Sequence, residues 1–234
     1  MVGGDEVLTH PLPLAAQGTW APSLIARSDV LARKPAGVSW AVAGAFPVPA
    51  LTAVQVVDES LRLRSGETLL VSGAGGTTGG LIVSFAVLRG ADVLATAGPS
   101  SRERVVGAGA AIVVDYHDPD WPREILAATE GRGVDAAANV ARGGAAIAMQ
   151  AVRDGGRLAT ITQDPPEPER GIDVSSVYVR PDAGQLEEAS GALGAGRLEF
   201  RLGARFPLAQ AHDALARAIA GASGAVALEC LGRS

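Results

Sequence analysis

The chain has 234 residues, of which 47% are hydrophobic and 19% are charged, so it can bury a sizeable core and is not a disordered chain. Its formal net charge is −5, and arginine supplies almost all of the positive charge, which offers no basic surface for nucleic acid. The single cysteine, Cys230, excludes an intrachain disulfide framework and a thiolate zinc cluster.

The amino-terminal residues carry acids where a signal peptide carries basic residues, and no apolar run reaches the roughly 20 residues that span a bilayer. Together with the single cysteine, this favours a cytoplasmic protein.

Residues 1–48 show short β-like runs at 6–8 and 24–26, separated by prolines and glycines. We interpret this part as a fragment of a β-rich domain. At the other end of the chain, a helix over 208–219 and a strand at 225–228 do not continue the pattern of the middle segment. We expect them to pack back against the amino-terminal part.

From residue 66 onward, strand-like and helical patterns alternate. Strands are predicted at 67–73, 92–97, 111–116, 134–140, 156–162 and 174–180, and helices at 78–88, 102–107, 121–129, 143–152 and 182–193. Asp120 is expected to cap the helix that begins at Trp121. The strands are apolar without alternation, which indicates a parallel sheet covered on both faces. The segment 164–169 is expected to be a turn-rich loop.

A glycine-rich turn, VSGAGGTTGG at residues 71–80, joins the first of these strands to its helix. Gly73, Gly76 and Gly79 follow the spacing G-x-x-G-x-x-G, while the stricter G-x-G-x-x-G form fails at Thr78. Such a turn brings the backbone close to a pyrophosphate at the helix N-terminus, and predicts a Rossmann-type dinucleotide site. The alternative is a connection without a ligand. A Walker P-loop is excluded because no Lys follows the glycines.

The end of the second strand distinguishes the two dinucleotides, because an acid there binds the ribose 2′-hydroxyl and repels a 2′-phosphate. The segment after this strand begins Gly98-Pro99-Ser100-Ser101-Arg102 and carries no acid at its tip. Two serines and an arginine suit a phosphate, which favours NADPH. The alternative is that Arg102 and Arg104 belong to an ordinary solvated helix face.

Other enzyme classes fit less well. Neither Tyr116 nor Tyr178 is followed by the Lys that a short-chain dehydrogenase needs, and a methyltransferase that uses S-adenosylmethionine would favour an acid after the second strand. The three histidines, His10, His117 and His212, show no metal-ligand spacing, so no metal is expected.

The order of motifs resembles the medium-chain dehydrogenase/reductase superfamily, within it the zinc-independent quinone oxidoreductase and enoyl reductase branch. Residues 2–7 resemble its V-G-D-x-V strand, residues 18–21 its G-x-[YW]-A motif, and residues 34–53 its K-P-x-G…L-T-A segment. The glycine turn, Val114-Asp115-Tyr116, Gly133-Val134-Asp135, Gly155-Gly156-Arg157-Leu158 and Gly224-Ala225-Val226-Ala227-Leu228 follow in the same order.

The resemblance implies a Rossmann NADPH-binding domain over residues 50–196 and a partial GroES-like β-rich domain from residues 1–49 and 197–234. It places Gly76 and Thr77 against the pyrophosphate, Ser101 and Arg102 at the 2′-phosphate and Tyr116 near the adenosine. Asn139 and Val140 would lie behind the nicotinamide ribose, and Thr52 near the nicotinamide. The residues assigned to the cofactor site are Thr52, Gly73, Gly75, Gly76, Thr77, Thr78, Gly79, Ser100, Ser101, Arg102, Tyr116, Asn139, Val140 and Thr162.

Two hypotheses stay open. The first is an NADPH-dependent oxidoreductase that reduces a quinone or an activated enone or enoyl double bond by hydride transfer. The second is a cofactor-binding or partner-binding protein with an inactive cleft, because the resemblance implies that the strands lining the family's cleft have no counterpart here. We also expect a homodimer through residues 174–180, an edge strand with an alternating pattern.

Overall fold

The computed structural model describes residues 1–11 and 18–230. These residues form two compact units. We call residues 52–178 the sheet unit, and residues 1–51 together with the described residues from 179 onward the terminal unit. No helix within the described ranges is long and apolar enough to cross a membrane.

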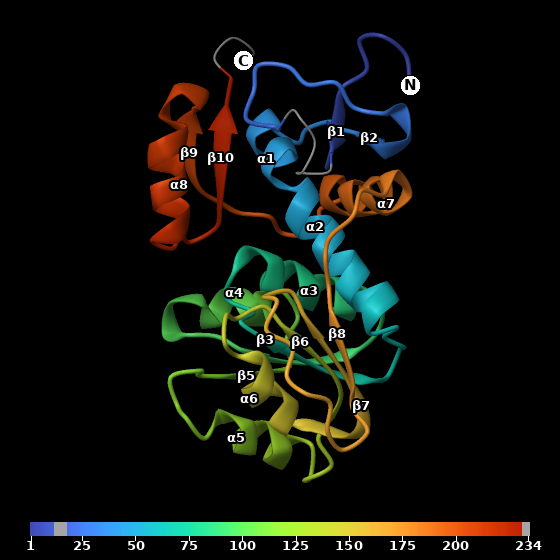
Figure 1. Ribbon diagram of the computed structural model, residues 1–234, viewed down its shortest axis with the longest axis vertical. Coiled ribbons are helices and arrows are strands. Elements are labelled where there is room, and N and C mark those ends of the chain that lie inside the picture. Colours follow the sequence, from blue (N-terminus) through green and yellow to red (C-terminus); the bar gives the residue numbers. More distant parts are fainter. Residues whose placement is uncertain (12–17, 231–234) are drawn as a thin grey trace. The chain divides into compact units, whose positions relative to one another are not determined.

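The sheet unit is built on six parallel strands in the order β5-β4-β3-β6-β7-β8 (Figure 1). The strands are β3 (Thr68–Ser72), β4 (Asp92–Thr96), β5 (Ile112–Val114), β6 (Val134–Asn139), β7 (Val152–Thr160) and β8 (Asp173–Ser176). The chain runs outward from β3 to β5, then returns to β6 and runs outward to β8. The reversal between β3 and β6 is the switch point of a doubly wound Rossmann sheet, which confirms the predicted fold class.

Helices cover both faces of this sheet, with α3 and α4 on one side and α5 and α6 on the other (Figure 1). The helical segments are η2 (Gln55–Ser60, π-helical), α3 (Thr77–Leu88), η3 (Pro99–Ser101, 3₁₀), α4 (Arg102–Gly107), α5 (Trp121–Ala128) and α6 (Ala145–Gln150). Leu70 and Leu94 of the sheet share one buried cluster with Trp121, Ile125 and Met149 of α5 and α6. The strands lack alternation because both of their faces are buried.

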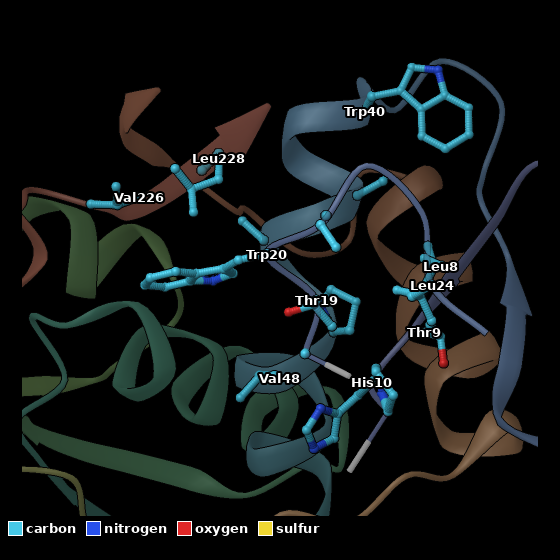
Figure 2. Close-up of a pocket in the computed structure, with 18 of the residues that line it drawn as sticks. Leu8, Thr9, His10, Thr19, Trp20, Leu24, Trp40, Val48, Val226 and Leu228 are labelled. Carbon is cyan, nitrogen blue, oxygen red and sulfur yellow. The ribbon is translucent and has the colours of Figure 1, made fainter. Parts of the chain in front are cut away.

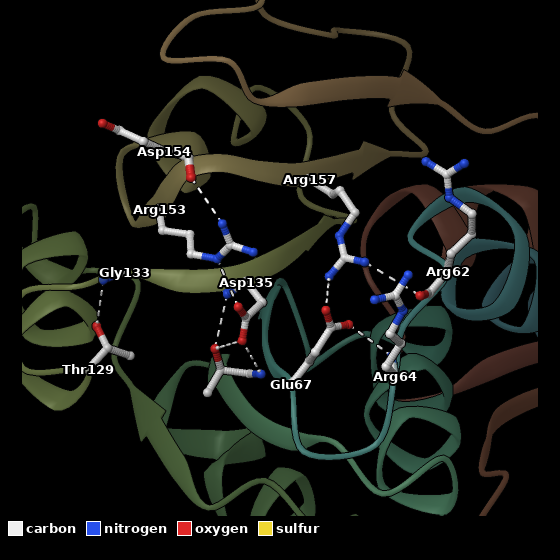
Figure 3. A network of polar contacts seen from close by, with 10 residues as sticks. Arg62, Arg64, Glu67, Thr129, Gly133, Asp135, Arg153, Asp154 and Arg157 are labelled. Carbon is white, nitrogen blue, oxygen red and sulfur yellow. Dashed lines mark hydrogen bonds and ion pairs between the residues drawn. The ribbon is translucent and has the colours of Figure 1, made fainter.

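Polar contacts fix the register at the amino ends of the central strands (Figure 3). The carboxylate of Asp135 accepts hydrogen bonds from the amide and hydroxyl of Thr68, each at 2.9 Å, and from Nε of Arg153 at 2.8 Å. Glu67 forms an ion pair with Arg157 at 2.8 Å. These contacts tie β3, β6 and β7 together at the end of the sheet opposite the glycine turn.

The terminal unit has two small two-stranded sheets within its described residues. Its segments are β1 (Val7–Thr9), η1 (Ser28–Val30), β2 (Leu31–Arg33), α1 (Trp40–Ala45), α7 (Ala183–Gly194), β9 (Leu202–Pro207), η4 (Leu208–Gln210), α8 (Ala211–Ile219) and β10 (Ala225–Glu229). The strands β1 and β2 are antiparallel, whereas β9 and β10 are parallel with α8 between them. The helix α2 (Pro47–Val54) crosses the division between the two units.

The predicted strand at 24–26 is wrong. These residues form no strand, and Ile25 is 93% exposed, while its neighbour Leu24 is half-buried. Residues 40–45, for which the sequence predicted no element, form the helix α1, and the Ser39 hydroxyl caps it by accepting from the Val42 amide at 3.3 Å. Asp120 stands at the N-cap position of α5, as predicted, although its side chain makes no capping hydrogen bond in the described structure.

The two compact units divide the chain at Val179, whereas the expected domain boundary lies at residue 197. The difference is α7, which packs against β2 in the terminal unit. A carboxylate oxygen of Glu187 accepts a hydrogen bond from the Arg33 amide at 2.7 Å, and the Ser190 hydroxyl donates to the Arg33 carbonyl at 3.5 Å.

Candidate functional site

The glycine turn between β3 and α3 is shaped by two glycines that leave no room for a side chain. Gly73 has a φ of +90°, and a Cβ there would lie 3.0 Å from Cγ2 of Val140. A Cβ on Gly79 would lie 2.4 Å from the Gly73 carbonyl oxygen and 2.8 Å from Cα of Ala74. The first turn of α3 therefore presses directly on the turn, as a dinucleotide-binding βαβ unit requires.

The N-terminus of α3 is left open for a ligand. Gly76 is its N-cap residue, and a Cβ there would meet only the Gly73 carbonyl oxygen, at an ordinary 3.6 Å. The backbone N–H groups of Thr77, Thr78 and Gly79 lie in the first turn, where a helix offers them no acceptor. Open N–H groups and the helix dipole together favour a phosphate at this position.

Arg104 and Ser101 stabilise the turn from the side of α4. Nη2 of Arg104 donates to the Gly75 carbonyl at 3.0 Å, and a Cβ on Gly75 would lie 2.5 Å from Oγ of Ser101. Ser101 is buried, and its hydroxyl donates to the Gly98 carbonyl at 3.2 Å. Sequence reasoning considered Arg104 only as part of a solvated face, because its acceptor lies 29 positions away in the chain. Ser100 and Arg102, in contrast, are exposed.

Tyr116 lies beside Gly98, just after the end of β4, and its place near the adenosine stays a prediction. A Cβ on Gly98 would lie 3.2 Å from Cε1 of Tyr116, and the Tyr116 and His117 rings are 4.1 Å apart between centroids. Asp115 accepts hydrogen bonds from the His117 amide at 3.0 Å and pairs with its Nδ1 at 2.7 Å. The His117 amide contributes most to lowering the pKa of Asp115, and the charge of Arg102 acts in the same direction. The end of β4 therefore carries no carboxylate, whereas the end of β5 carries that of Asp115.

Asn139 lies at the carboxyl end of β6 and is fully buried. Its Nδ2 lies 3.0 Å from the Ala141 carbonyl and from the hydroxyls of Thr160 and Thr162, and its Oδ1 accepts from the Ala141 amide at 3.3 Å. These protein contacts occupy both polar atoms of the side chain. The Asn139 side chain therefore holds Ala141, Thr160 and Thr162 in place, and its amide is engaged within the protein.

Asp164 completes this network, and sequence reasoning missed it because it stands in a turn-rich loop. Its Oδ2 accepts from the Gly143 amide at 2.7 Å, and its Oδ1 accepts from the hydroxyls of Thr160, at 3.2 Å, and Thr162. The Thr162 hydroxyl has the largest effect on the pKa of Asp164 and lowers it; burial raises that pKa by less, and the Gly143 amide lowers it further.

The structure brings most of the predicted cofactor residues to the carboxyl edge of the sheet. Val140 follows β6 and donates its amide to the Ser72 carbonyl at 2.9 Å, beside the glycine turn. Thr162 lies beyond β7 in the Asn139 network. Thr52 is buried in α2, and its place beside the nicotinamide stays a prediction.

The terminal unit contains an apolar pocket of about 1100 Å³ (Figure 2). Its described lining includes Trp20, Leu24, Trp40, Val48, Val226 and Leu228. Polar groups are few there, and one of them, His10, is buried with no hydrogen-bond partner for its Nε2 among the described residues. Burial lowers the pKa of His10, against a smaller rise from its hydrogen bond to the Val179 backbone. An apolar pocket with a few polar groups suits a small apolar molecule.

The histidines do not form a metal site in the described parts of the chain. His10 is buried in the terminal unit, His117 pairs with Asp115, and His212 is exposed beside Asp213. Across residues 1–11 and 18–230, no group of three or more His, Cys, Asp or Glu side chains is arranged to hold a metal ion.

A doubly wound sheet with an open glycine turn at its switch point defines a dinucleotide-binding fold. Comparison with known proteins gives its family. The model of the zinc-binding dehydrogenase family matches residues 108–224, half of the chain. The chain therefore belongs to this family, within the medium-chain dehydrogenase/reductase superfamily, as the resemblance predicted. The described residues nevertheless offer no ligand set for the zinc in the family's name.

Individual relatives agree with this assignment. A probable zinc-binding oxidoreductase of Arthroderma benhamiae is 29% identical over 90% of this chain and 68% of its own. Erythronolide synthase EryA2 of Saccharopolyspora erythraea is 35% identical over 58% of this chain, which spans 4% of that protein. A solved NAD-dependent alcohol dehydrogenase superposes with a TM-score of 0.82 at 28% identity, over 91% of this chain and 65% of its own.

Proposed function

We propose that the chain is an NADPH-dependent oxidoreductase that reduces a quinone or an activated enone or enoyl double bond without zinc. The open N-terminus of α3 at the switch point carries this proposal, because Gly76 leaves three backbone N–H groups facing a place that a pyrophosphate can occupy. The sheet unit would hold the cofactor, which supplies the hydride when bound.

The preference for NADPH rests on charge at the end of β4. Ser100 and Arg102 are exposed there, and residues 97–102 after the strand contain no acid. Asp115 is the nearby carboxylate, but His117 pairs with it and Arg102 lies within its electrostatic reach. A 2′-phosphate would meet the arginine and the Ser100 hydroxyl, while an unmodified ribose would lack the acidic partner that NAD sites provide.

The lack of a zinc ligand set in the described residues supports an acceptor that is reduced without a metal. An acceptor carbon that is activated by its own conjugation, as in quinones, enones and enoyl compounds, can take a hydride without a metal to polarise it. Hydride addition to such an acceptor leaves an enolate or phenolate oxygen, which takes its proton from a donor or from water.

Titration of the purified protein with NADPH and with NADH tests the cofactor, and steady-state reduction of quinones and enones tests the reaction. We expect NADPH to bind more tightly, and Arg102→Ala to weaken NADPH selectively by on the order of 1.5–3 kcal/mol. Arg123→Ala is the matched control, because Arg123 is also exposed on a helix of the sheet unit but pairs with Asp120. Equal affinities for both dinucleotides would refute the assignment. Tight binding without turnover would favour the second hypothesis, an inactive cofactor-binding protein.

We further propose a homodimer and a cytoplasmic location. The strand β8 lies at one edge of the sheet, and no described strand pairs with its outer side, so it is open to a second copy. The described Cys230 carries a free, exposed thiol, which suits a reducing compartment.

A further inference from the structure

We propose that Asp164 is a positioning residue that holds the loop over residues 140–144 and the Thr162 hydroxyl in place for the nicotinamide half of the cofactor. This inference rests on the proposed function, since it assumes that a nicotinamide dinucleotide binds at the switch point.

The first support is the number of groups that one carboxylate joins. Asp164 accepts a hydrogen bond from the Gly143 amide in the loop after β6 and from the hydroxyls of Thr160 and Thr162 at the end of β7. Its ionised form accepts all of these hydrogen bonds at once, and bonds of N–H and O–H donors to a carboxylate are stronger than bonds between neutral groups. The side chain therefore ties the ends of two neighbouring strands to each other.

The second support is the shape of the loop that Asp164 holds. A Cβ on Gly144 would lie 2.8 Å from Oδ1 of Asn139 and 3.1 Å from the Ala141 carbonyl, so the loop folds closely over the buried Asn139 amide. Gly143 has a φ of +74° and is exposed. Asn139 thus fixes the inner side of the loop, and Asp164 fixes its outer side at Gly143.

The third support is where the network lies in the sheet. In a doubly wound fold the two halves of the sheet take the two nucleotides, and the crevice opens between them at the switch point. Ser100, Arg102 and Tyr116 follow β4 and β5, on the adenosine side of the glycine turn. Asp164 and its partners follow β6 and β7, on the opposite side. A change at Asp164 should therefore disturb the nicotinamide half and leave the adenosine half unchanged.

The alternative is that Asp164 only stabilises a loop. Its removal would then lower the stability of the fold without a selective loss of affinity for one ligand. Binding of two probes separates these roles. NADPH occupies both halves of the site, whereas 2′,5′-ADP occupies the adenosine half alone. A purely structural defect changes the affinities for NADPH and for 2′,5′-ADP together, or changes neither.

The experiment compares wild type, Asp164→Asn and Asp164→Ala in equilibrium titrations with NADPH and with 2′,5′-ADP. The matched control is Asp173→Asn, whose carboxylate is exposed at the amino end of β8 and pairs with Arg62 at 3.3 Å. We expect both Asp164 variants to bind NADPH roughly tenfold or more weakly, because bonds to a charged acceptor are lost. Their affinity for 2′,5′-ADP should stay within about twofold of wild type, as expected for a distant site.

Equal weakening of both ligands, or no weakening of NADPH, would overturn the role of Asp164. A wild-type protein that binds neither NADPH nor NADH would instead overturn the proposed function, and this inference with it. Amide exchange of Gly143 without any ligand checks the contact itself. The amide should be protected in the wild type and exchange faster in Asp164→Ala, and unchanged exchange would also refute the inference.

Discussion

Two adjacent glycines of α3 should respond in opposite ways to the same substitution. A Cβ on Gly79 would lie 2.4 Å from the Gly73 carbonyl oxygen and 2.8 Å from Cα of Ala74, and both are backbone atoms that cannot swing aside. A Cβ on Gly80 would lie 3.7 Å from the Ala74 carbonyl oxygen, an ordinary contact. Overpacking of this kind costs about 1–3 kcal/mol, whereas alanine in place of glycine favours a helix by about 1 kcal/mol.

We therefore expect Gly79→Ala to lower the free energy of unfolding by about 1–2 kcal/mol, and Gly80→Ala to raise it by about 0.5–1 kcal/mol. For a chain of this size, the two melting temperatures should differ by roughly 5 °C. Urea and thermal unfolding of the ligand-free proteins, followed by far-UV circular dichroism, measure both quantities. If Gly79→Ala is as stable as Gly80→Ala, the close packing of α3 on the turn is wrong.

Three further predictions concern the cofactor site, the sheet edge and a helix cap. Gly76→Val should fold normally yet lose NADPH binding, because the new side chain takes the place of the pyrophosphate; normal binding would show that the turn is only structural. Val177→Lys, directly after β8, should convert a dimer to a monomer in sedimentation, and a monomeric wild type at micromolar concentration would remove this edge of the sheet as the interface. Asp182→Ala should lose about 1 kcal/mol of stability, because Asp182 accepts from the Gln185 amide at 3.0 Å at the N-cap of α7, whereas Asp182→Asn should lose little. The Gln185 amide lowers the pKa of Asp182, so this stability is fully present above the ordinary value of 3.8 and is lost as pH falls through the lowered pKa.

The sequence was sufficient to predict the sheet unit because its signals are local and repeated. Every strand from β3 to β8 overlaps a predicted apolar run, and the glycine turn lies between a strand and a helix where its spacing placed it. Glycine at Gly73 and Gly79 reflects a backbone requirement, which a sequence records directly.

In the terminal unit, α8 and β10 match the helix predicted at 208–219 and the strand predicted at 225–228. The strand β9 and parts of the site could not be predicted, because their partners are distant in sequence. The strand β9 contains a glycine and ends at Pro207, so its own residues give no strand signal. It is a strand because it pairs in parallel with β10, which follows the helix α8. Likewise, the sequence predicted only a turn at Asp164, because the Gly143 amide that donates to its carboxylate lies 21 positions away. The tie between Arg104 and Gly75 was hidden for the same reason.

The glycine turn also determines how this site can be lost. Its surface toward the ligand is main chain. Neighbouring atoms occupy the space that side chains at Gly73, Gly75 and Gly79 would need. No functional group has to be deleted to disable such a surface. One added methyl group at any of these positions meets a backbone or side-chain atom within about 3.0 Å. The site is therefore most vulnerable to mutations that add atoms, and a survey of inactivating variants should find small-to-large changes in this turn before it finds losses of charged or polar side chains.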